Sequence, residues 1–136
     1  MLTSAEAVYL DSTGLVKLVI PEAESAPLQR YLVGKPWRVS CRLAKVEVVR
    51  AVMAHGAGAV ARAQELLRRL VLVQLTDALL SDAALLEPLP LRSLDAIHLA
   101  AARTLGRDLA VLVTYDERMA AAAAQLGITV DAPGRS

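Results

Sequence analysis

Short apolar runs alternate with stretches of helical periodicity along most of this chain. The clearest run is Leu109–Val113, whose unbroken apolar character is typical of a strand covered on both faces. Before it, apolar residues recur at near-helical spacing from Ala96 to Leu105, which predicts a helix that Asp95 opens. Gly106 is expected to end that helix, because glycine readily takes the positive φ of a helix terminus.

The same alternation predicts further elements on both sides of this stretch. The other expected strands are Glu6–Leu10, Trp37–Cys41, Val71–Leu75 and Ile128–Val130. The other expected helices are Leu15–Ile20, Glu22–Val33, Leu43–Ala54, Val60–Leu70, one that Thr76 or Asp77 caps and that runs through Leu86, and Asp116–Leu126; Glu87–Arg92 is an expected loop. Because strands alternate with helices, we predict an α/β fold with a parallel sheet and helices on both faces.

Length and composition fit one globular domain. The chain has 136 residues, of which 55% are hydrophobic and 21% charged, which suits a folded protein with a single core. We expect the domain to span residues 1–132 and residues 133–136 to form a loose tail. The net charge of +1 gives no strong field that would by itself indicate nucleic acid.

Hydropathy and cysteine content bear on the compartment. No apolar run approaches the roughly 18 residues that a membrane span needs. The first residues, MLTSAEAVYL, contain no basic segment, so we expect no signal peptide. A lone Cys41 cannot form an internal disulfide, which fits the reducing cytoplasm. We therefore expect a cytoplasmic protein that has no membrane partner.

Four of the fourteen acidic residues stand among core-type neighbours. Asp11 and Asp116 follow predicted strands, whose carboxyl ends form the edge where open α/β sheets bind ligands. Glu47 and Asp95 lie on predicted helices that flank the same edge. We expect these four carboxylates to gather there.

The acids at helix starts also have ordinary structural roles, because helix N-termini favour acidic residues. Asp11 would cap the helix that follows it, and Asp95 would be a first-turn acid behind a Ser93 cap. Taken one at a time, these roles are the commoner ones.

The other two acids have equally ordinary alternatives. Thr114 and Glu117 have the spacing of a capping box, which would leave Asp116 as a mere first-turn acid. Glu47 would pair with Arg50 one turn further along its helix, a weak surface interaction.

The conjunction of all four acids indicates a metal site. Crowded carboxylates repel one another and stay ionised only beside a cation. Hard oxygen ligands, without a His or Cys cluster, favour Mg²⁺ or Mn²⁺ over zinc. Such an ion can turn water into a nucleophile and neutralise charge on a phosphodiester. This chemistry predicts a metal-dependent nuclease.

Four segments carry a family resemblance that runs from about Val8 to Val130. They are YLDSTGLVKLVIPE, AKVEVVRA, LRSLDAIHLAAA and LVTYDERMAAAAAQLGI. On these segments the chain resembles PIN-domain ribonucleases of the VapC toxin type. The resemblance implies a three-layer α/β/α sandwich around a parallel sheet of about five strands.

The resemblance also implies the chemistry and the residues of the site. Mg²⁺, or Mn²⁺ in its place, would be held by the acids and would activate water to hydrolyse RNA, leaving a 5′-phosphate and a 3′-hydroxyl. The residues that match the family's metal-binding acids and supporting hydroxyls are Asp11, Glu47, Asp95 and Asp116, with Ser12 and Thr114.

Family membership would further imply partners. We expect an RNA substrate, a cognate antitoxin protein that inhibits the toxin, and a homodimer. The main alternative is a catalytically silent PIN-like module that only binds a partner or RNA. The presence of all four acids argues against that alternative, because loss of activity usually shows as loss of a ligand.

Four side chains near the acids have two interpretations each. Arg42 and Arg92 are candidate phosphate contacts, or else exposed salt-bridge residues. His98 lies one turn from Asp95, and we expect it at the helix surface or partly buried, because hard metals rarely choose imidazole. Tyr115 is expected to pack in the domain rather than to stack on an RNA base.

Overall fold

The computed structural model describes residues 5–87 and 90–135 and contains one parallel sheet. Its five strands run in the spatial order β3-β2-β1-β4-β5, and every neighbouring pair is parallel. The strands are β1 (Ala7–Leu10), β2 (Arg38–Cys41), β3 (Val71–Val73), β4 (Leu109–Val113) and β5 (Val130–Asp131). The predicted parallel sheet is thus confirmed, and β4 has the bounds expected from its apolar run.

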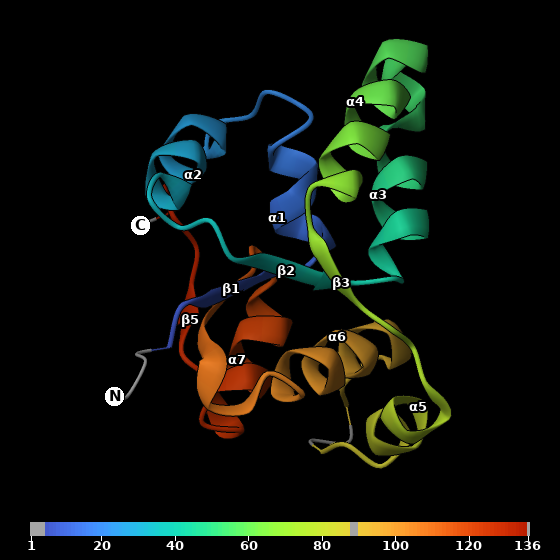
Figure 1. Ribbon diagram of the computed structural model, residues 1–136, viewed down its shortest axis with the longest axis vertical. Coiled ribbons are helices and arrows are strands. Elements are labelled where there is room, and N and C mark those ends of the chain that lie inside the picture. The colour runs from blue at the N-terminus through green and yellow to red at the C-terminus, as the bar shows by residue number, and fades with distance from the viewer. Residues whose placement is uncertain (1–4, 88–89, 136) are drawn as a thin grey trace.

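Helices cover both faces of this sheet, as Figure 1 shows. One layer holds α1 (Ser12–Lys17), α2 (Ser25–Leu32), α3 (Ala44–Val52) and α4 (Ala57–Arg68). The opposite layer holds α5 (Asp77–Ala84), α6 (Ser93–Arg103) and α7 (Glu117–Gln125). The molecule is therefore the predicted three-layer α/β/α sandwich.

The alternation of side chains along β1 divides the core in two. Val8 and Leu10 pack with the layer of α1 to α4, whereas Ala7 and Tyr9 pack with the layer of α5 to α7. Successive residues of a strand point to opposite faces, so an entirely apolar strand can be buried on both. This is why β1 and β4 could be recognised from their apolar runs alone.

Two predicted helices near the N-terminus are shorter than expected. The helix predicted to reach Ile20 ends at Lys17, and the helix predicted from Glu22 begins at Ser25. The Ser25 hydroxyl donates to the Ile20 carbonyl and accepts from the Glu22 amide, so it organises this turn. Side-chain hydrogen bonds of serine compete with helix bonds in this way.

Glycines and caps shift other boundaries by a few residues. A 3₁₀ turn (Met53–His55) leads into Gly56 at φ +97°, and α4 begins directly after it rather than at Val60. Helix α5 is capped by Thr76, whose hydroxyl accepts from the Leu79 amide at 3.1 Å. It ends at Ala84 instead of Leu86.

The helix before β4 also ends earlier than predicted. Helix α6 stops at Arg103, and Gly106 (φ +54°) begins a short 3₁₀ turn, Gly106–Asp108, that leads into β4. The strand expected at Ile128–Val130 is shifted to Val130–Asp131. Part of the expected loop Glu87–Arg92, residues 88–89, lies outside the described residues.

Residues 133–135 contact the domain, in contrast to the loose tail that was expected. Pro133 is buried, and its carbonyl accepts the Tyr115 hydroxyl at 2.8 Å. Arg135 donates to the Tyr115 carbonyl and lies over the Tyr115 ring, 5.3 Å from its centroid. Arg135 also lies 3.7 Å from Glu24, so residues 133–135 are packed beside α2.

Across the described ranges, no helix has the length and apolar character that crossing a membrane requires.

Candidate active site

The carboxyl ends of β1 and β4 lie side by side at one edge of the sheet. Leu10 pairs with Val113 as the last residue of each strand. The next residues along each chain segment are therefore neighbours, and the Thr114 hydroxyl donates to Asp11 Oδ2 at 2.6 Å. This bond joins the two segments that sequence analysis singled out.

Asp11 is both a helix cap and part of this edge. Its side chain is only 2% exposed, and its Oδ1 accepts from the Gly14 amide at 3.2 Å and from the Thr13 hydroxyl at 2.5 Å. Burial raises the pKa of Asp11, although the bonds from Thr114 and Thr13 oppose that rise. The predicted capping role is therefore correct, and it coexists with a place at the sheet edge.

Glu47 reaches the same region from α3. Its Oε1 accepts from the Ser12 hydroxyl at 2.5 Å and lies 2.7 Å from His98 Nε2. Burial would raise the pKa of Glu47, but the bonds from His98 and Ser12 outweigh it and lower the pKa. The structure thus pairs Glu47 with His98 and Ser12, and the alternative pairing with Arg50 is wrong.

His98 is buried, contrary to the expectation of a surface or partly buried residue. It is 2% exposed, and its Nδ1 lies 2.8 Å from the Tyr9 hydroxyl and 3.8 Å from Cys41 Sγ. Burial would lower the pKa of His98, but the bonds with Cys41 and Glu47 raise it to about 10. The available signal was its place one turn after Asp95 among the apolar residues Ile97, Leu99 and Ala100 of the same helix.

Asp95 faces Asp116 across the gap between α6 and α7, with Arg92 between them. Arg92 Nε lies 3.5 Å from Asp95 Oδ2, and Arg92 Nη2 lies 3.3 Å from Asp116 Oδ2. Burial and the nearby charge of Asp116 raise the pKa of Asp95, although Arg92 opposes them. Arg92 is also the N-cap residue of α6, so Ser93 is the first helical residue and not the cap that was predicted.

Asp116 caps α7, and the predicted capping box is wrong. Asp116 Oδ1 accepts from the amides of Arg118 and Met119 at 2.9 and 3.3 Å. Thr114 instead accepts from the Asp116 amide at 3.1 Å while its hydroxyl donates to Asp11. Thr114 therefore links two of the four acids directly.

The remaining sequence candidates lie elsewhere or pack. Arg42 lines a groove of about 670 Å³ that runs beside β3 and also includes Lys45 and Arg68. Tyr115 is 7% exposed, and Lys17 lies over its ring, 4.8 Å from the centroid. The packing interpretation of Tyr115 is confirmed, while Arg42 forms no ion pair with any of the four acids among the described residues.

The donor set at this edge suits a hard divalent cation. Asp95 Oδ2 is buried and has no hydrogen-bond partner in the described chain, although Arg92 Nε lies 3.5 Å from it as an ion-pair partner. The side-chain oxygens at this edge belong to carboxylates and hydroxyls, which Mg²⁺ and Mn²⁺ prefer. Among residues 5–87 and 90–135, no three His, Cys, Asp or Glu side chains already converge as a metal-holding group. The four acids therefore have the donor atoms that such an ion prefers, but their side chains would have to move closer together to bind it.

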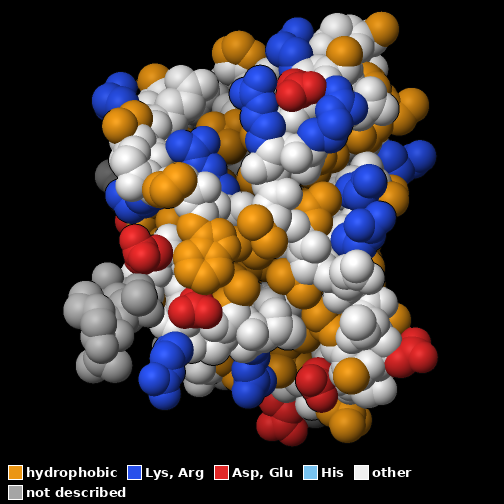
Figure 2. All heavy atoms as spheres, viewed as in Figure 1, with side chains coloured by type: hydrophobic (Ala, Val, Ile, Leu, Met, Phe, Trp, Pro, Cys, Tyr) orange, Lys and Arg blue, Asp and Glu red, His pale blue; other side chains and the backbone are white. Residues whose placement is uncertain are grey.

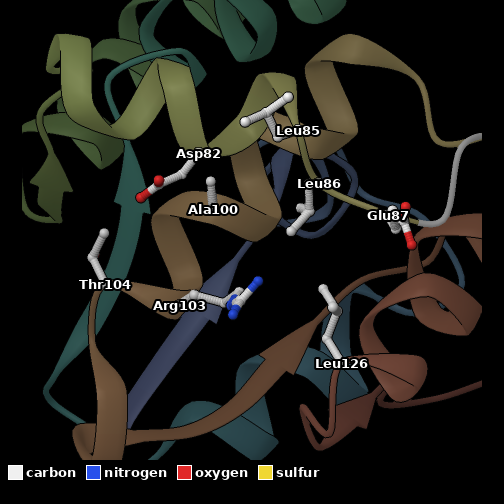
Figure 3. A pocket seen from close by; sticks show the side chains of 8 residues that line it. All are labelled: Asp82, Leu85, Leu86, Glu87, Ala100, Arg103, Thr104 and Leu126. Carbon is white, nitrogen blue, oxygen red and sulfur yellow. The ribbon is translucent and has the colours of Figure 1, made fainter.

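A second hollow lies at the far end of α6, away from the acids. This pocket of about 500 Å³ is formed by α5, the end of α6 and Leu126, and Arg103 extends into it (Figure 3). Arg103 is eight residues beyond Asp95, about 12 Å along the helix. None of the four acids lines this pocket.

The surface carries opposite charges in different places on the face drawn in Figure 2. Lys and Arg side chains gather over α3 and α4, whereas Asp and Glu side chains mark the lower edge near α5. Although the net charge of the chain is only +1, basic side chains are concentrated on the surface of α3 and α4.

Comparison with known proteins adds family information to this geometry. A model described as "PIN domain" matches residues 8–125. Ribonuclease VapC46 of Mycobacterium tuberculosis (strain ATCC 25618 / H37Rv) is 47% identical over 127 residues, covering 93% of this chain and 98% of that protein. Ribonuclease VapC47 of strain CDC 1551 / Oshkosh is 36% identical over 132 residues, covering 93% and 97%.

A solved structure supports the fold. The crystal structure of Mycobacterium tuberculosis VapC20, a Sarcin-Ricin loop cleaving toxin, superposes with a TM-score of 0.73 at 18% sequence identity. The match covers 85% of this chain and 94% of that chain.

Proposed function

The chain belongs to the PIN-domain family of VapC-type ribonucleases, and on that premise we propose that it is a Mg²⁺-dependent endoribonuclease, the toxin of a toxin–antitoxin pair. The proposed ligands are Asp11, Glu47, Asp95 and Asp116, and Mn²⁺ is the expected substitute ion. The observation that carries this proposal is the buried Asp95 oxygen without a hydrogen-bond partner, which lies near the carboxylate of Asp116 and has only an exposed guanidinium, that of Arg92, as its ion-pair partner. A first-turn acid of a helix has no need of a second carboxylate beside it, whereas a metal ligand keeps an oxygen available for the ion.

The chain's own residues would prepare the site for hydrolysis. When bound, the ion would supply an activated water and neutralise charge on the phosphodiester. Ser12 and Thr114 hold Glu47 and Asp11 in place through their hydroxyls. Hydrolysis would follow in-line attack on phosphorus and leave a 5′-phosphate and a 3′-hydroxyl.

Basic residues supply the proposed contacts to the RNA backbone. Arg92 stands at the acids with a side chain that is 62% exposed, so it is free to turn toward a phosphate. Arg42 lies in the groove that also contains Lys45 and Arg68. Arginine suits phosphate because its planar fork can donate two parallel hydrogen bonds.

The proposed protein partners are an antitoxin and a second copy of the chain. Two apolar side chains of the α3 region, Val46 and Met53, are each 56% exposed, which supports an apolar contact surface there. We place the action of the toxin in the cytoplasm, where RNA is present and the single buried Cys41 would stay reduced.

The alternative is a silent PIN-like module that binds RNA or a partner without cleaving. The same experiment distinguishes the two functions. Purified, antitoxin-free protein is incubated with a mixed RNA pool in three arms: Mg²⁺, EDTA, and Asp95→Asn with Mg²⁺. Cleavage in the first arm alone would support the nuclease, and sequencing the RNA ends would identify its target.

Two other outcomes would contradict the proposal. Cleavage that persists in Asp95→Asn would point to a contaminant or to chemistry at another site. Absence of cleavage of every RNA in the pool, together with Mg²⁺ binding by calorimetry, would favour the silent module.

A further inference from the structure

We propose that His98 is a positioning residue that fixes the Glu47 carboxylate for metal binding, and that Tyr9 in turn fixes the imidazole. This inference rests on the proposed function, since it concerns how one proposed ligand is held. The three side chains form a continuous path from the core of the α6 layer to the sheet edge.

The chemistry of the contact sets the direction of the hydrogen bond. An ionised carboxylate can only accept, so His98 Nε2 must carry the proton that it shares with Glu47 Oε1 across 2.7 Å. The other nitrogen, Nδ1, accepts from the Tyr9 hydroxyl when the ring is neutral and donates to it when the ring is charged. Both states leave Nε2 as the donor to Glu47.

The imidazole is held rigidly enough to position another group. Tyr9 is fully buried and His98 nearly so. Their rings meet edge to face, with centroids 5.9 Å apart and planes at 78°, a favoured aromatic arrangement. Packing and the hydrogen bond to Tyr9 fix the orientation of the imidazole. A fixed imidazole restricts the conformations of the carboxylate to which it is hydrogen-bonded.

The two donors to Glu47 converge on the same oxygen. Ser12 and His98 both reach Oε1, so neither bond occupies Oε2, which is available to a cation. Asp95 and His98 also lie three residues apart on α6, a spacing that puts them on one face of the helix. One helix would thus supply a ligand directly and orient a second ligand that belongs to α3.

Calorimetric titration of the full-length chain with Mg²⁺ tests this inference, with Mn²⁺ followed by electron paramagnetic resonance in parallel. His98→Ala is expected to weaken metal binding about 10- to 100-fold, the usual effect of losing a partner of a metal ligand. His98→Gln, whose amide can still donate to Glu47, should recover part of that affinity. Tyr9→Phe should weaken binding less than His98→Ala, because the imidazole remains.

A double-mutant cycle separates positioning from general stability. In a Glu47→Gln background, His98→Ala should change metal affinity by less than about twofold, because the residue through which it acts is altered. Circular dichroism and thermal melts in EDTA check that each variant is folded. Equal losses in both backgrounds would show a structural role and overturn the inference, as would unchanged affinity in the single variant. Failure of the wild-type chain to bind either ion would instead overturn the proposed function, and this inference with it.

Discussion

The four acids at the sheet edge fall into two pairs that are held in different ways. The inner carboxylates, Asp11 and Glu47, accept hydrogen bonds from hydroxyl groups and from a buried imidazole. The outer carboxylates, Asp95 and Asp116, share one exposed guanidinium, that of Arg92. The inner pair is held by buried groups, Asp11 being buried itself and Glu47 being bonded to the buried His98, whereas the outer pair is balanced by a side chain that solvent can reach.

This difference indicates where a bound cation would act. Exposed ion pairs contribute about 0 to 1 kcal/mol, so the contacts of Arg92 can be exchanged for those of a metal at little expense in free energy. Breaking the inner hydrogen bonds would leave buried polar groups unsatisfied, which costs about 1 to 3 kcal/mol each. We therefore expect the inner pair to stay fixed on metal binding and the outer pair to adjust.

Removal of an inner carboxylate should have the largest effect on activity. Asp11→Asn is expected to lower the RNA cleavage rate more than about 100-fold, beyond the usual effect of an outer-shell partner. Its matched control is Asp77→Asn, which alters an exposed acid in the first turn of α5 and should leave the rate unchanged. Equal rates for both variants would remove Asp11 from the proposed site.

The same variant gives a stability prediction whose sign follows from the pKa of Asp11. Burial raises that pKa in the folded protein, so ionisation of Asp11 opposes folding above the raised pKa, and this penalty vanishes below the unfolded value of about 3.9. Measured in EDTA at about pH 8, the free energy of unfolding of Asp11→Asn should be no lower than that of wild type. Its advantage should shrink as the pH falls toward about 4. A large loss of stability at neutral pH would mean that the carboxylate serves mainly as a cap.

The hydroxyl that joins the two pairs should have the next largest effect. Thr114→Val removes the bonds to Asp11 Oδ2 and to the Asp116 amide without changing the size of the side chain greatly. Mg²⁺ affinity by calorimetry is expected to fall about 10-fold or more, and Thr114→Ser should retain most of it. Thr104→Val, which removes a hydroxyl bond at the far end of α6, is the control and should bind Mg²⁺ normally.

Sequence patterns predicted most of the fold because its strands are apolar on both faces. The run Leu109–Val113 could be assigned to the residue, and the alternation of elements led directly to a parallel sheet. Boundaries were missed where side-chain hydrogen bonds decide them. The Ser25 hydroxyl shortens two neighbouring helices, and that effect cannot be seen in a periodicity of apolar positions.

The four acids were proposed from their apolar neighbours and the hydroxyls of Ser12 and Thr114 from the family resemblance, but the contact between His98 and Glu47 was not predicted. His98 was expected at the helix surface or partly buried, because nothing in the local sequence shows that Glu47 and Tyr9 approach it from other elements. Thr114 had two interpretations, a supporting hydroxyl from the family resemblance and a capping-box residue from its spacing to Glu117. Its bond to Asp11, which follows the neighbouring strand, shows that the capping box is wrong. Contacts between distant segments depend on how β1 and β4 are aligned in the sheet, and this register cannot be deduced from a single sequence.

Removal of Arg92 should have a smaller and opposite effect on metal binding. Arg92→Ala takes away the cation that competes for the outer carboxylates, so Mg²⁺ should bind more tightly, by about two- to fivefold for an exposed pair. The control is Arg107→Ala, which removes the same charge at the opposite end of β4. A gain of the same size in both variants would assign the effect to net charge and not to the contacts of Arg92.

The smallest expected effect separates the two roles of Asp116. In EDTA, Asp116→Asn should unfold at the same urea concentration as wild type, because an amide oxygen can still accept from the Arg118 and Met119 amides. Asp116→Ala should lose about 0.5 to 2 kcal/mol, the usual cost of removing a helix cap. Both variants should bind Mg²⁺ weakly, since both lack the carboxylate. Glu117→Gln, a neighbouring change of charge outside the cap, should alter neither property. If Asp116→Asn proved as destabilising as Asp116→Ala, the ion pair between Asp116 and Arg92 would stabilise this end of α7. The outer carboxylates would then be less free to move on metal binding than the exposure of Arg92 suggests.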